Sequence, residues 1–438
     1  MKFTKFGKAL LMGAVSVGIV LSVTSCVETY SVGYLYVTGT ATAQSSGSGI
    51  ISGFKIDHNT GLLTAVNGLP ISSGGANPGR ATLVSGSRFL YVLNRGTNAS
   101  GGSECTTANP CQNSNITQFA VGGNGILTPQ QTFYTQGVNP MRIFADASGQ
   151  FLFVLDHDAP SNAACALALG SSATSCGDIT VFSINSSTGR LQLVVNAQVT
   201  AANGAELTYF PVPANPIDFV LAGSTIFTLS GTPATGDSVF PYAEAAATGQ
   251  LTVTQNTAQP LNIAQGTAIV SGSSYIYVLD NEPIVANGTT SPSQILPFTM
   301  GAGGSLQPQT GGIVPDDPTL SNPGYLLVES KGKFLYVANQ GNNTSTTNAQ
   351  SGLAGYVIDP TTHQLSYIAG EPFGTGAGPQ CLVEDPSNQF IYTANFNDST
   401  VTGRVVDPNS GVLTNMRVTN SYPLSGPAAW CLVDGRTD

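Results

Sequence analysis

The sequence predicts an all-β fold, a seven-bladed β-propeller in which each blade is a four-stranded antiparallel sheet. One phrase occurs seven times, and its fullest copies begin at Asn139 (NPMRIFADASGQFLFVLD) and Gly378 (GPQCLVEDPSNQFIYTAN). An aromatic residue at the centre of the phrase recurs at intervals of 50 to 74 residues. These aromatic residues are Tyr36, Tyr91, Phe153, Phe227, Tyr277, Tyr336 and Tyr392. A repeat of this period must stack on its neighbours, because one blade cannot bury both of its faces alone.

Each repeat divides into four strand segments. The first strand opens with a proline in six repeats: Pro78, Pro140, Pro216, Pro323, Pro379 and Pro427. In the fifth repeat it begins near Gln265 without one. The second strand is the LYV segment, the third contains TQF, TVF or GYV, and a turn of the type D-x-x-T-G-x-L leads to the fourth. Apolar residues alternate within these segments, and no stretch of the mature chain shows helical periodicity.

The two ends of the repeat region predict how the ring closes. Residues 33–37 form a second strand without a first strand before it, and residues 427–433 form a first strand without a second strand after it. The C-terminal strand should therefore complete the first blade. Such closure removes free sheet edges and fastens the ring.

The N-terminus predicts export and anchoring. Lys2, Lys5 and Lys8 precede an uncharged, mostly apolar run, residues 9–23, that is short for a membrane span. The following Thr-Ser-Cys resembles a bacterial lipobox, which implies lipidation of Cys26. The alternative is an ordinary secretory signal with an incidental cysteine.

This interpretation divides the chain into three parts. Residues 1–25 are a lipoprotein signal peptide, 26–33 are the lipidated cysteine with a short tether, and 34–438 are the propeller. The protein is expected in the cell envelope, on the periplasmic or outer-membrane side, with the membrane as a partner through its lipid. The net charge of −10 and the lack of a basic stripe disfavour nucleic-acid binding.

Seven cysteines are present, and six remain if Cys26 carries lipid. An even number in an oxidising compartment predicts disulfides. The natural pairing is Cys105 with Cys111, Cys165 with Cys176, and Cys381 with Cys431. The third pair is the least certain geometrically, because inner strands of adjacent blades splay and the Cα atoms must lie within about 7 Å. No C-x-x-C motif occurs and histidines are scarce, so no metal site and no cofactor are expected.

The long insertions all join the second strand of a blade to the third. They are residues 95–115, 157–178, 281–293 and 340–352. These loops share one propeller face with the strand-opening prolines, at the mouth of the central channel. An elaborated, disulfide-stapled face is a candidate functional face, although neutral drift in solvent loops would produce the same pattern.

The repeats resemble a known family. The proline lies thirteen residues before the central aromatic residue in four repeats, and Y-V-x-N is followed by V-x-x-F-x-I-D-x-x-T-G-x-L. This pattern is similar to the lactonase family of seven-bladed propellers, which contains 6-phosphogluconolactonases and muconate-cyclising enzymes. The resemblance implies hydrolysis of sugar lactones. The positions that correspond to the family's catalytic His, Arg and Glu are Met141, Ile217 and Gly231, and Asp218 takes the place of a further His. The family's mechanism therefore does not carry over.

Other polar residues are expected at the mouth. Arg80, Arg142 and Asp218 are the candidate catalytic residues, and Tyr325, Gln265 and Gln380 are candidate ligand-binding residues. The two arginines could hold a carboxylate or phosphate. Asp218 could pair with Arg142 or act as a base, and the alternative is an Arg–Asp bridge with a structural role only. His157 is expected to be a solvated loop residue, and Trp430 a core residue rather than a stacking platform.

Three functions fit these patterns. The first is an extracytoplasmic hydrolase of a small sugar lactone or related acid. The second is a surface propeller without catalysis that binds a glycan, peptide or partner protein through its looped face. Across these functions the possible ligands are a small sugar acid, a glycan or an envelope protein. The third is a purely structural lipoprotein. We favour a lactonase-like propeller in which catalysis is lost or altered, because function depends on the site rather than on the fold.

Overall fold

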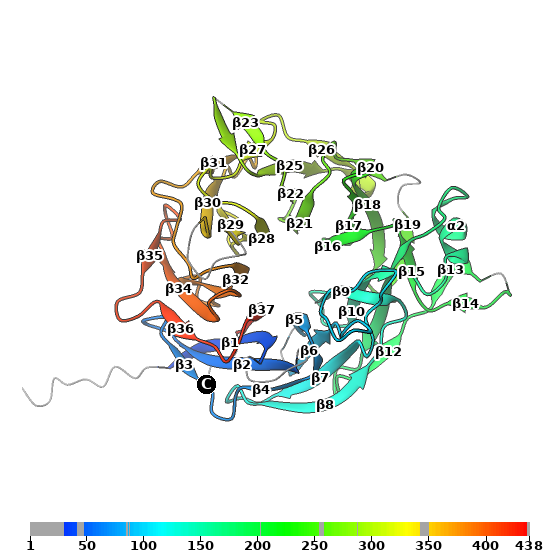
Figure 1. Ribbon diagram of the computed structural model, residues 1–438, viewed down its shortest axis with the longest axis horizontal. Coiled ribbons are helices and arrows are strands. Elements are labelled where there is room, and N and C mark those ends of the chain that lie inside the picture. Colours follow the sequence, from blue (N-terminus) through cyan, green and yellow to red (C-terminus); the bar gives the residue numbers. More distant parts are fainter. Residues whose placement is uncertain are drawn as a thin grey trace, which may run out of the picture. The chain divides into compact units, whose positions relative to one another are not determined.

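The structure is a computed structural model that describes residues 30–41, 48–84, 86, 88–201, 203–253, 258–286, 288–341 and 350–435. The predicted signal peptide and Cys26 lie outside the described residues. Two compact units are present, Met1–Tyr30 and Ser31–Asp438. The second unit is the predicted seven-bladed β-propeller, whose innermost strands are arranged around a central axis (Figure 1). Within the described ranges, we find no helix with the length and apolar character that a membrane crossing requires.

Each blade is the predicted antiparallel meander, and its four strands follow one another from the channel outward. Blade 1 consists of β37 (Ala428–Asp434), β1 (Ser31–Thr40), β2 (Ser48–Asp57) and β3 (Leu63–Ala65). Blade 2 consists of β5 (Pro78–Leu83), β6 (Phe89–Asn94), β7 (Asn115–Val121) and β8 (Leu127–Phe133). Blade 3 consists of β9 (Val138–Ala145), β10 (Phe151–Asp158), β11 (Gly177–Ile184) and β12 (Leu191–Leu193). Blade 4 consists of β16 (Pro216–Ala222), β17 (Thr225–Thr232), β18 (Gly236–Ala245) and β19 (Gln250–Val253).

The remaining blades have the same order of strands. Blade 5 consists of β21 (Gly266–Ser271), β22 (Tyr275–Asp280), β25 (Gln294–Met300) and β26 (Leu306–Pro308). Blade 6 consists of β28 (Pro323–Val328), β29 (Phe334–Asn339), β30 (Gly352–Ile358) and β31 (Leu365–Tyr367). Blade 7 consists of β32 (Pro379–Glu384), β33 (Phe390–Asn395), β34 (Thr400–Val406) and β35 (Leu413–Asn415).

Connecting segments add short strands to this frame. In five blades, part of the link to the next blade pairs with the third strand: β4 (Ile71–Ala76), β15 (Phe210–Val212), β20 (Gln259–Pro260), β27 (Val314–Pro315) and β36 (Ser421–Pro423). Two separate hairpins are formed by β13 (Asn196–Thr200) with β14 (Glu206–Leu207), and by β23 (Ile284–Ala286) with β24 (Thr289–Ser291).

The expectation of no helix was wrong. The insertion 157–178 contains α2 (Ala163–Leu169), and a 3₁₀ turn, η1 (Ala302–Gly304), precedes β26. The sequence of α2, AACALAL, consists mostly of strong helix formers. Two helical turns are too short for a 3.6-residue period to stand out, which is why the pattern gave no signal.

The recurring aromatic residues join each blade to the next one. Their side chains are fully buried in the second strand of each blade. Where the residue is tyrosine, its hydroxyl donates a hydrogen bond to a carbonyl in the turn before the fourth strand of the following blade. Among the described residues these bonds are Tyr36 to Gly125 (2.8 Å), Tyr91 to Gly189 (2.5 Å), Tyr277 to His363 (2.7 Å), Tyr336 to Gly411 (2.7 Å) and Tyr392 to Gly61 (2.6 Å). Phe153 and Phe227 have no hydroxyl, so the two junctions that flank blade 4 lack this bond.

The ring closes as predicted. β37 pairs antiparallel with β1, with Leu432 opposite Tyr36 and Trp430 opposite Thr38. All three predicted disulfides are also confirmed. The Cα–Cα distances are 5.2 Å for Cys105–Cys111, 5.6 Å for Cys165–Cys176 and 5.8 Å for Cys381–Cys431. The third bond joins β32 of blade 7 to β37 of blade 1, so the splay between these inner strands is small enough for a bridge.

The chain joins the propeller far from the channel mouth. Tyr34 near the start of β1 lies opposite Asp434, at the end of β37. The other end of β37 carries Trp430, which lines the mouth pocket described below. Ser31 therefore lies at the propeller face opposite that pocket.

Candidate functional site

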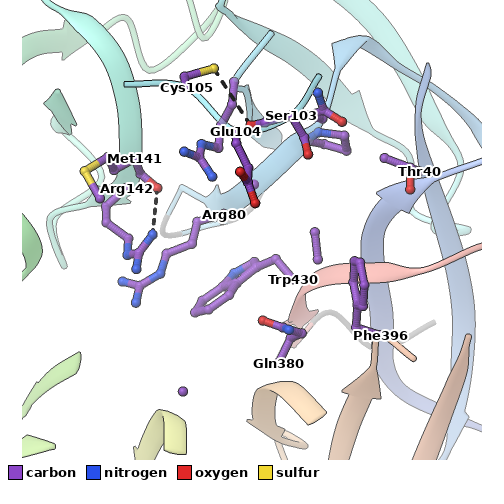
Figure 2. A pocket seen from close by; sticks show the side chains of 16 residues that line it. Thr40, Arg80, Ser103, Glu104, Cys105, Met141, Arg142, Gln380, Phe396 and Trp430 are labelled. Atoms are coloured by element: carbon purple, nitrogen blue, oxygen red, sulfur yellow. Dashed lines mark hydrogen bonds between the residues drawn. The ribbon is translucent and has the colours of Figure 1, made fainter. Parts of the chain in front are cut away.

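A cavity of about 520 Å³ opens at the channel mouth. It is formed by the starts of the inner strands of blades 1, 2, 3, 6 and 7, together with the insertion after β6 (Figure 2). We call it the mouth pocket. Its lining residues are Thr40, Asn77, Pro78, Gly79, Arg80, Arg95, Ser103, Glu104, Cys105, Met141, Arg142, Gly324, Gln380, Phe396, Ala429 and Trp430.

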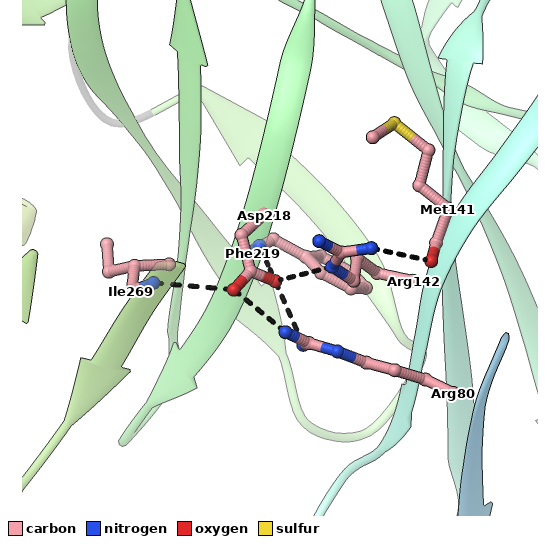
Figure 3. A network of polar contacts seen from close by, with 6 residues as sticks. All are labelled: Arg80, Met141, Arg142, Asp218, Phe219 and Ile269. Atoms are coloured by element: carbon pink, nitrogen blue, oxygen red, sulfur yellow. Dashed lines mark hydrogen bonds and ion pairs between the residues drawn. The ribbon is translucent and has the colours of Figure 1, made fainter. Parts of the chain in front are cut away.

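The three candidate catalytic residues meet in one polar network, and two of them, Arg80 and Arg142, line this pocket (Figure 3). Arg80 of blade 2 forms two contacts of 2.9 Å with the carboxylate of Asp218 in blade 4, and the Arg142 Nε of blade 3 lies 3.3 Å from Asp218 Oδ1. The backbone N–H groups of Phe219 and Ile269 also donate to this carboxylate, at 2.9 and 3.3 Å. Asp218 is completely buried. Of the two roles considered for Asp218, this geometry matches the ion pair.

Arg142 is the more loosely held of the two arginines. Its Nη1 donates to the carbonyl of Met141 at 3.1 Å, and its side chain remains 25% exposed. Burial and the neighbouring Arg80 lower the pKa of Arg142 to about 10, against the opposing effect of Asp218. The guanidinium therefore stays charged at neutral pH, next to the pocket.

Arg80 is fixed between aromatic rings as well as by its ion pair. Its Cζ lies 4.6 Å from the ring centre of Trp430 and 5.6 Å from that of Tyr325. These two rings meet edge to face, with centroids 4.9 Å apart. Trp430 is half-buried, packs against the hydrophobic clusters of blades 7, 1 and 2, and also lines the pocket. The prediction of a core residue is therefore only partly right.

The other predicted ligand-binding residues are separated. Gln380 lines the pocket and accepts a hydrogen bond of 3.3 Å from the Gln340 side chain. Tyr325 lies behind Arg80 and Trp430, and burial raises the pKa of its hydroxyl. Gln265 is exposed on blade 5, outside the pocket lining.

Two charged pocket residues were missed by sequence reasoning. Arg95 directly follows β6, and Glu104 lies in the insertion that Cys105–Cys111 closes. Burial lowers the pKa of Arg95, and its side chain has no hydrogen bond or ion pair with any described residue. Figure 2 shows Glu104 directed from its loop into the pocket. Both residues lie in the first long insertion, so a charge search of the insertions as well as of the inner strands would have found them.

The loop that carries Glu104 is held against blade 3. The Thr107 hydroxyl and the Asn139 amide each donate to the Asp158 carboxylate at 2.7 Å, and the Cys111 N–H donates to Asn139 Oδ1 at 2.7 Å. His157, predicted as a solvated loop residue, is partly exposed, and its Nδ1 lies 3.1 Å from Asp158 Oδ2. These bonds give the pocket rim a defined position.

The three positions predicted from the sequence to match the family's ionisable residues have different surroundings. Met141 lines the pocket, whereas Ile217 packs in the hydrophobic cluster between blades 4 and 5. Gly231 has a φ of 157°, and a Cβ at this position would lie 2.3 Å from Asp237 Oδ1. A glutamate side chain has no space there while Asp237 keeps its position. Among the residues that the structure describes, no three His, Cys, Asp or Glu side chains gather to hold a metal ion.

Two neighbouring carboxylates lie at the mouth end of blade 3. Asp156 and Asp178 are cross-strand neighbours in β10 and β11, and both are completely buried. The Thr180 hydroxyl is 3.2 Å from one carboxylate and 3.3 Å from the other. Burial raises the pKa of Asp156 to about 8, and burial together with Asp156 raises the pKa of Asp178 well above its usual range. At neutral pH Asp156 therefore holds a proton that the unfolded chain would release.

The pair predicts a pH-dependent stability. Because the folded pKa values are raised, the pair's contribution is complete below the unfolded pKa, near 4, and is lost as pH rises toward 8. The free energy of unfolding should fall by roughly 2–4 kcal/mol between pH 5 and pH 8. Each proton that is bound in the folded chain and released on unfolding lowers this free energy by about 1.4 kcal/mol per pH unit. Urea unfolding at several pH values measures this. In the double variant Asp156→Asn, Asp178→Asn the contribution of the pair to this slope should disappear, so parallel pH profiles for the two proteins would contradict the prediction.

Comparisons with known proteins agree with this architecture. The model of the family described as "Lactonase, 7-bladed beta-propeller" matches residues 47–205 and 293–430. A candidate 6-phosphogluconolactonase from Bacteroides fragilis superimposes with a TM-score of 0.64 at 15% identity, covering 94% of this chain and 99% of its own. The periplasmic gluconolactonase of Pseudomonas aeruginosa superimposes with a TM-score of 0.63 at 18% identity, covering 92% and 99%. No curated protein sequence matches this chain.

The gap between the two matched segments is informative about the site. It covers residues 206–292, which include all four strands of blade 4 and the first two strands of blade 5. Ile217, Asp218 and Gly231 all lie in this gap. The family model therefore does not match the blade that carries two of the three positions predicted to correspond to the family's catalytic residues.

Proposed function

Because this chain belongs to the lactonase family of seven-bladed β-propellers, we propose that its mouth pocket binds a sugar acid or the corresponding lactone without the family's hydrolytic machinery. The observation that carries this proposal is the charge arrangement of the pocket. Three guanidinium groups, those of Arg80, Arg95 and Arg142, line it, and the buried carboxylate of Asp218 is paired with two of them. Guanidinium groups recognise carboxylates through paired hydrogen bonds.

The same geometry disfavours turnover. Hydrolysis of a lactone needs a group that takes a proton from the attacking water and donors that stabilise the oxyanion. The arginines are suitable donors for a carbonyl oxygen. Asp218 is a poor base, because its Oδ1 accepts from the Phe219 N–H and its Oδ2 from Arg80 and the Ile269 N–H. Both arginines also form ion pairs with this carboxylate. A ligand should therefore bind and leave unchanged.

Hydrolysis is the second candidate, and Glu104 is the observation that favours it. Its carboxylate lines the pocket on a disulfide-closed loop. Acting as a base, Glu104 would take a proton from water while the oxygen attacks the carbonyl carbon. The ring C–O bond would then break, and the leaving oxygen would take up a proton to give the hydroxy acid.

One experiment separates the two functions. Residues 27–438 are titrated calorimetrically with gluconate, galactonate and their lactones, and proton release is recorded above the spontaneous rate. We expect binding without added proton release, and at least tenfold weaker binding in Arg142→Ala, a loss of about 1.4 kcal/mol. Arg190→Ala, which removes an exposed arginine from a turn of blade 3, is the matched control and should bind as the wild type does.

The other outcomes are equally decisive. Proton release that collapses in both Arg142→Ala and Glu104→Gln would identify a hydrolase that uses the same pocket. Absence of both binding and turnover with all four compounds would overturn the proposal and leave a surface propeller with a different partner.

We infer further that the protein works in the cell envelope, attached by a lipid on Cys26. Support comes from the exported character of the N-terminus and from three disulfides, which form in oxidising compartments. An anchor before Ser31 would be attached at the propeller face opposite the mouth pocket. Incorporation of an alkyne-labelled fatty acid into the wild type, lost in Cys26→Ser, checks this. Equal labelling of both proteins would contradict it.

A further inference from the structure

The mouth pocket has two chemically different ends. Arg80, Arg95 and Arg142 form a cationic end. Figure 2 shows Phe396 and Trp430 on a second side, away from Arg142, with Trp430 next to Arg80. We call the second side the aromatic end. A single small sugar acid would satisfy the first end and leave the second unused. The two ends belong to one cavity of about 520 Å³, within the range of sites that enclose ligands of considerable size.

The cationic end can bind one acidic group through Arg95. Arg80 and Arg142 are held in place by Asp218, whereas Arg95 is without a hydrogen-bonding or ion-pair partner among the described residues. The Nε of Arg95 is buried, and a buried cationic donor without a partner is costly. A ligand carboxylate next to Arg95 would supply the missing acceptor, and Glu104 at the rim would repel ligands that carry many negative charges.

The aromatic end is suited to a neutral sugar ring. Phe396 directly follows β33 and is 43% exposed, which is unusual for a phenylalanine beside a cavity. Trp430 is held by Arg80 and Tyr325, so its orientation is fixed before a ligand arrives. The Gln380 amide and the Thr40 hydroxyl also line this part of the pocket. Exposed ring surface beside an amide and a hydroxyl matches a pyranose, which has an apolar face and a rim of hydroxyl groups.

We propose that the mouth pocket binds an acidic oligosaccharide, with an acidic sugar on the arginines and the adjoining sugar unit against Phe396 and Trp430. This inference rests on the proposed function of the pocket and specifies its ligand class. It also accounts for an aromatic surface that a free sugar lactone would not need.

The single tryptophan of the chain makes the test direct. Trp430 is the only tryptophan, so its fluorescence reports ligand binding at this pocket alone. Residues 27–438, which contain the whole propeller, are titrated with lactobionic acid, cellobiouronic acid and a hyaluronan disaccharide, each of which joins one acidic sugar to one neutral sugar. Each is compared with its monosaccharide acid, and maltotriose serves as the neutral ligand. We expect at least one acidic oligosaccharide to bind ten times more tightly than its monosaccharide, and maltotriose to bind at least ten times more weakly.

Two variants measure the contributions of the aromatic end and of the cationic end to binding separately. Phe396→Ala should remove the advantage of the oligosaccharide and leave binding of the monosaccharide unchanged. Arg95→Gln should weaken both at least tenfold. Tyr134→Ala removes an aromatic residue that is 64% exposed on blade 2, Arg190→Ala removes an arginine elsewhere, and both should match the wild type.

Each alternative result has a definite meaning. If every oligosaccharide binds no better than its monosaccharide, the proposal is wrong while the proposed function stands. If maltotriose binds as tightly as the acidic ligands, the role of the arginines is wrong. If neither the monosaccharide acids nor the oligosaccharides change the fluorescence or give a calorimetric signal, the proposed function fails together with this inference.

Discussion

Removal of residues 425–438 is expected to abolish the cooperative unfolding transition of the propeller. The deletion removes β37, which provides the inner strand of blade 1 and pairs with β1 from Tyr34 to Gly39. It also leaves Cys381 without its disulfide partner and deletes Trp430 from the contact with Tyr325. The ring would then be open, with the unpaired edge of β1 exposed and the buried faces of blades 1 and 7 in contact with solvent.

Thermal unfolding and limited proteolysis measure this effect. A control that ends at Gly435 keeps all of β37 and should unfold like the wild type. The double variant Cys381→Ser, Cys431→Ser keeps the strand without the covalent link, and it should retain a cooperative transition at a lower temperature. A truncated protein with the wild-type melting temperature would show that closure by β37 is dispensable.

Replacement of Asp218 is expected to have the second large effect. Asp218→Ala leaves Arg80 and Arg142 close together without the carboxylate that both contact. Removing one member of a buried charge cluster costs about 3–5 kcal/mol, because the remaining charges lose their compensation. Asp218→Asn keeps side-chain hydrogen bonding but not the charge, so it should lose stability to a smaller extent.

Urea unfolding of these variants provides the measurement. Replacing Arg80, Arg142 and Asp218 together by leucine removes every charge of the cluster and should recover much of the stability lost in Asp218→Ala. The same triple variant should not bind gluconate. A loss below about 1 kcal/mol in Asp218→Ala would mean that solvent in the channel already screens the two arginines.

The repeats made the blade architecture predictable. Each blade carries the same proline, central aromatic residue and turn, and errors in reading one copy are corrected by the others. The tyrosine hydroxyls explain part of this regularity. Tyr392, for example, must reach the Gly61 carbonyl of the next blade, so its position in the strand is constrained on both sides of the junction.

The residues of the candidate site that lie on the repeated inner strands could be predicted from the sequence. Arg80, Arg142 and Asp218 occupy equivalent places near the start of inner strands, and inner strands of a propeller converge at the channel. Arg95 and Glu104 were missed because they belong to an insertion that occurs in one blade only. The path of that loop depends on its bonds to Asp158 and Asn139 in blade 3, which no local pattern reveals.

Gln265 shows the opposite limitation. Its place at the start of an inner strand suggested that it lies with the arginines, but the pocket is off-centre and blade 5 does not line it. Equivalent residues of different blades lie at the same depth along the propeller axis. They lie on different sides of that axis, because each blade is rotated relative to the next. Knowing that a residue faces the mouth therefore does not say which part of the mouth it faces.

The double pairing of β1 has a mechanical consequence. Tension transmitted along the backbone from residues before Ser31 would act along the axis of β1, which pairs with β2 on one edge and with β37 on the other. Extracting the strand would require shearing both rows of hydrogen bonds together rather than peeling them apart one at a time. A first strand that is paired on both edges therefore resists tension along its axis better than an edge strand would.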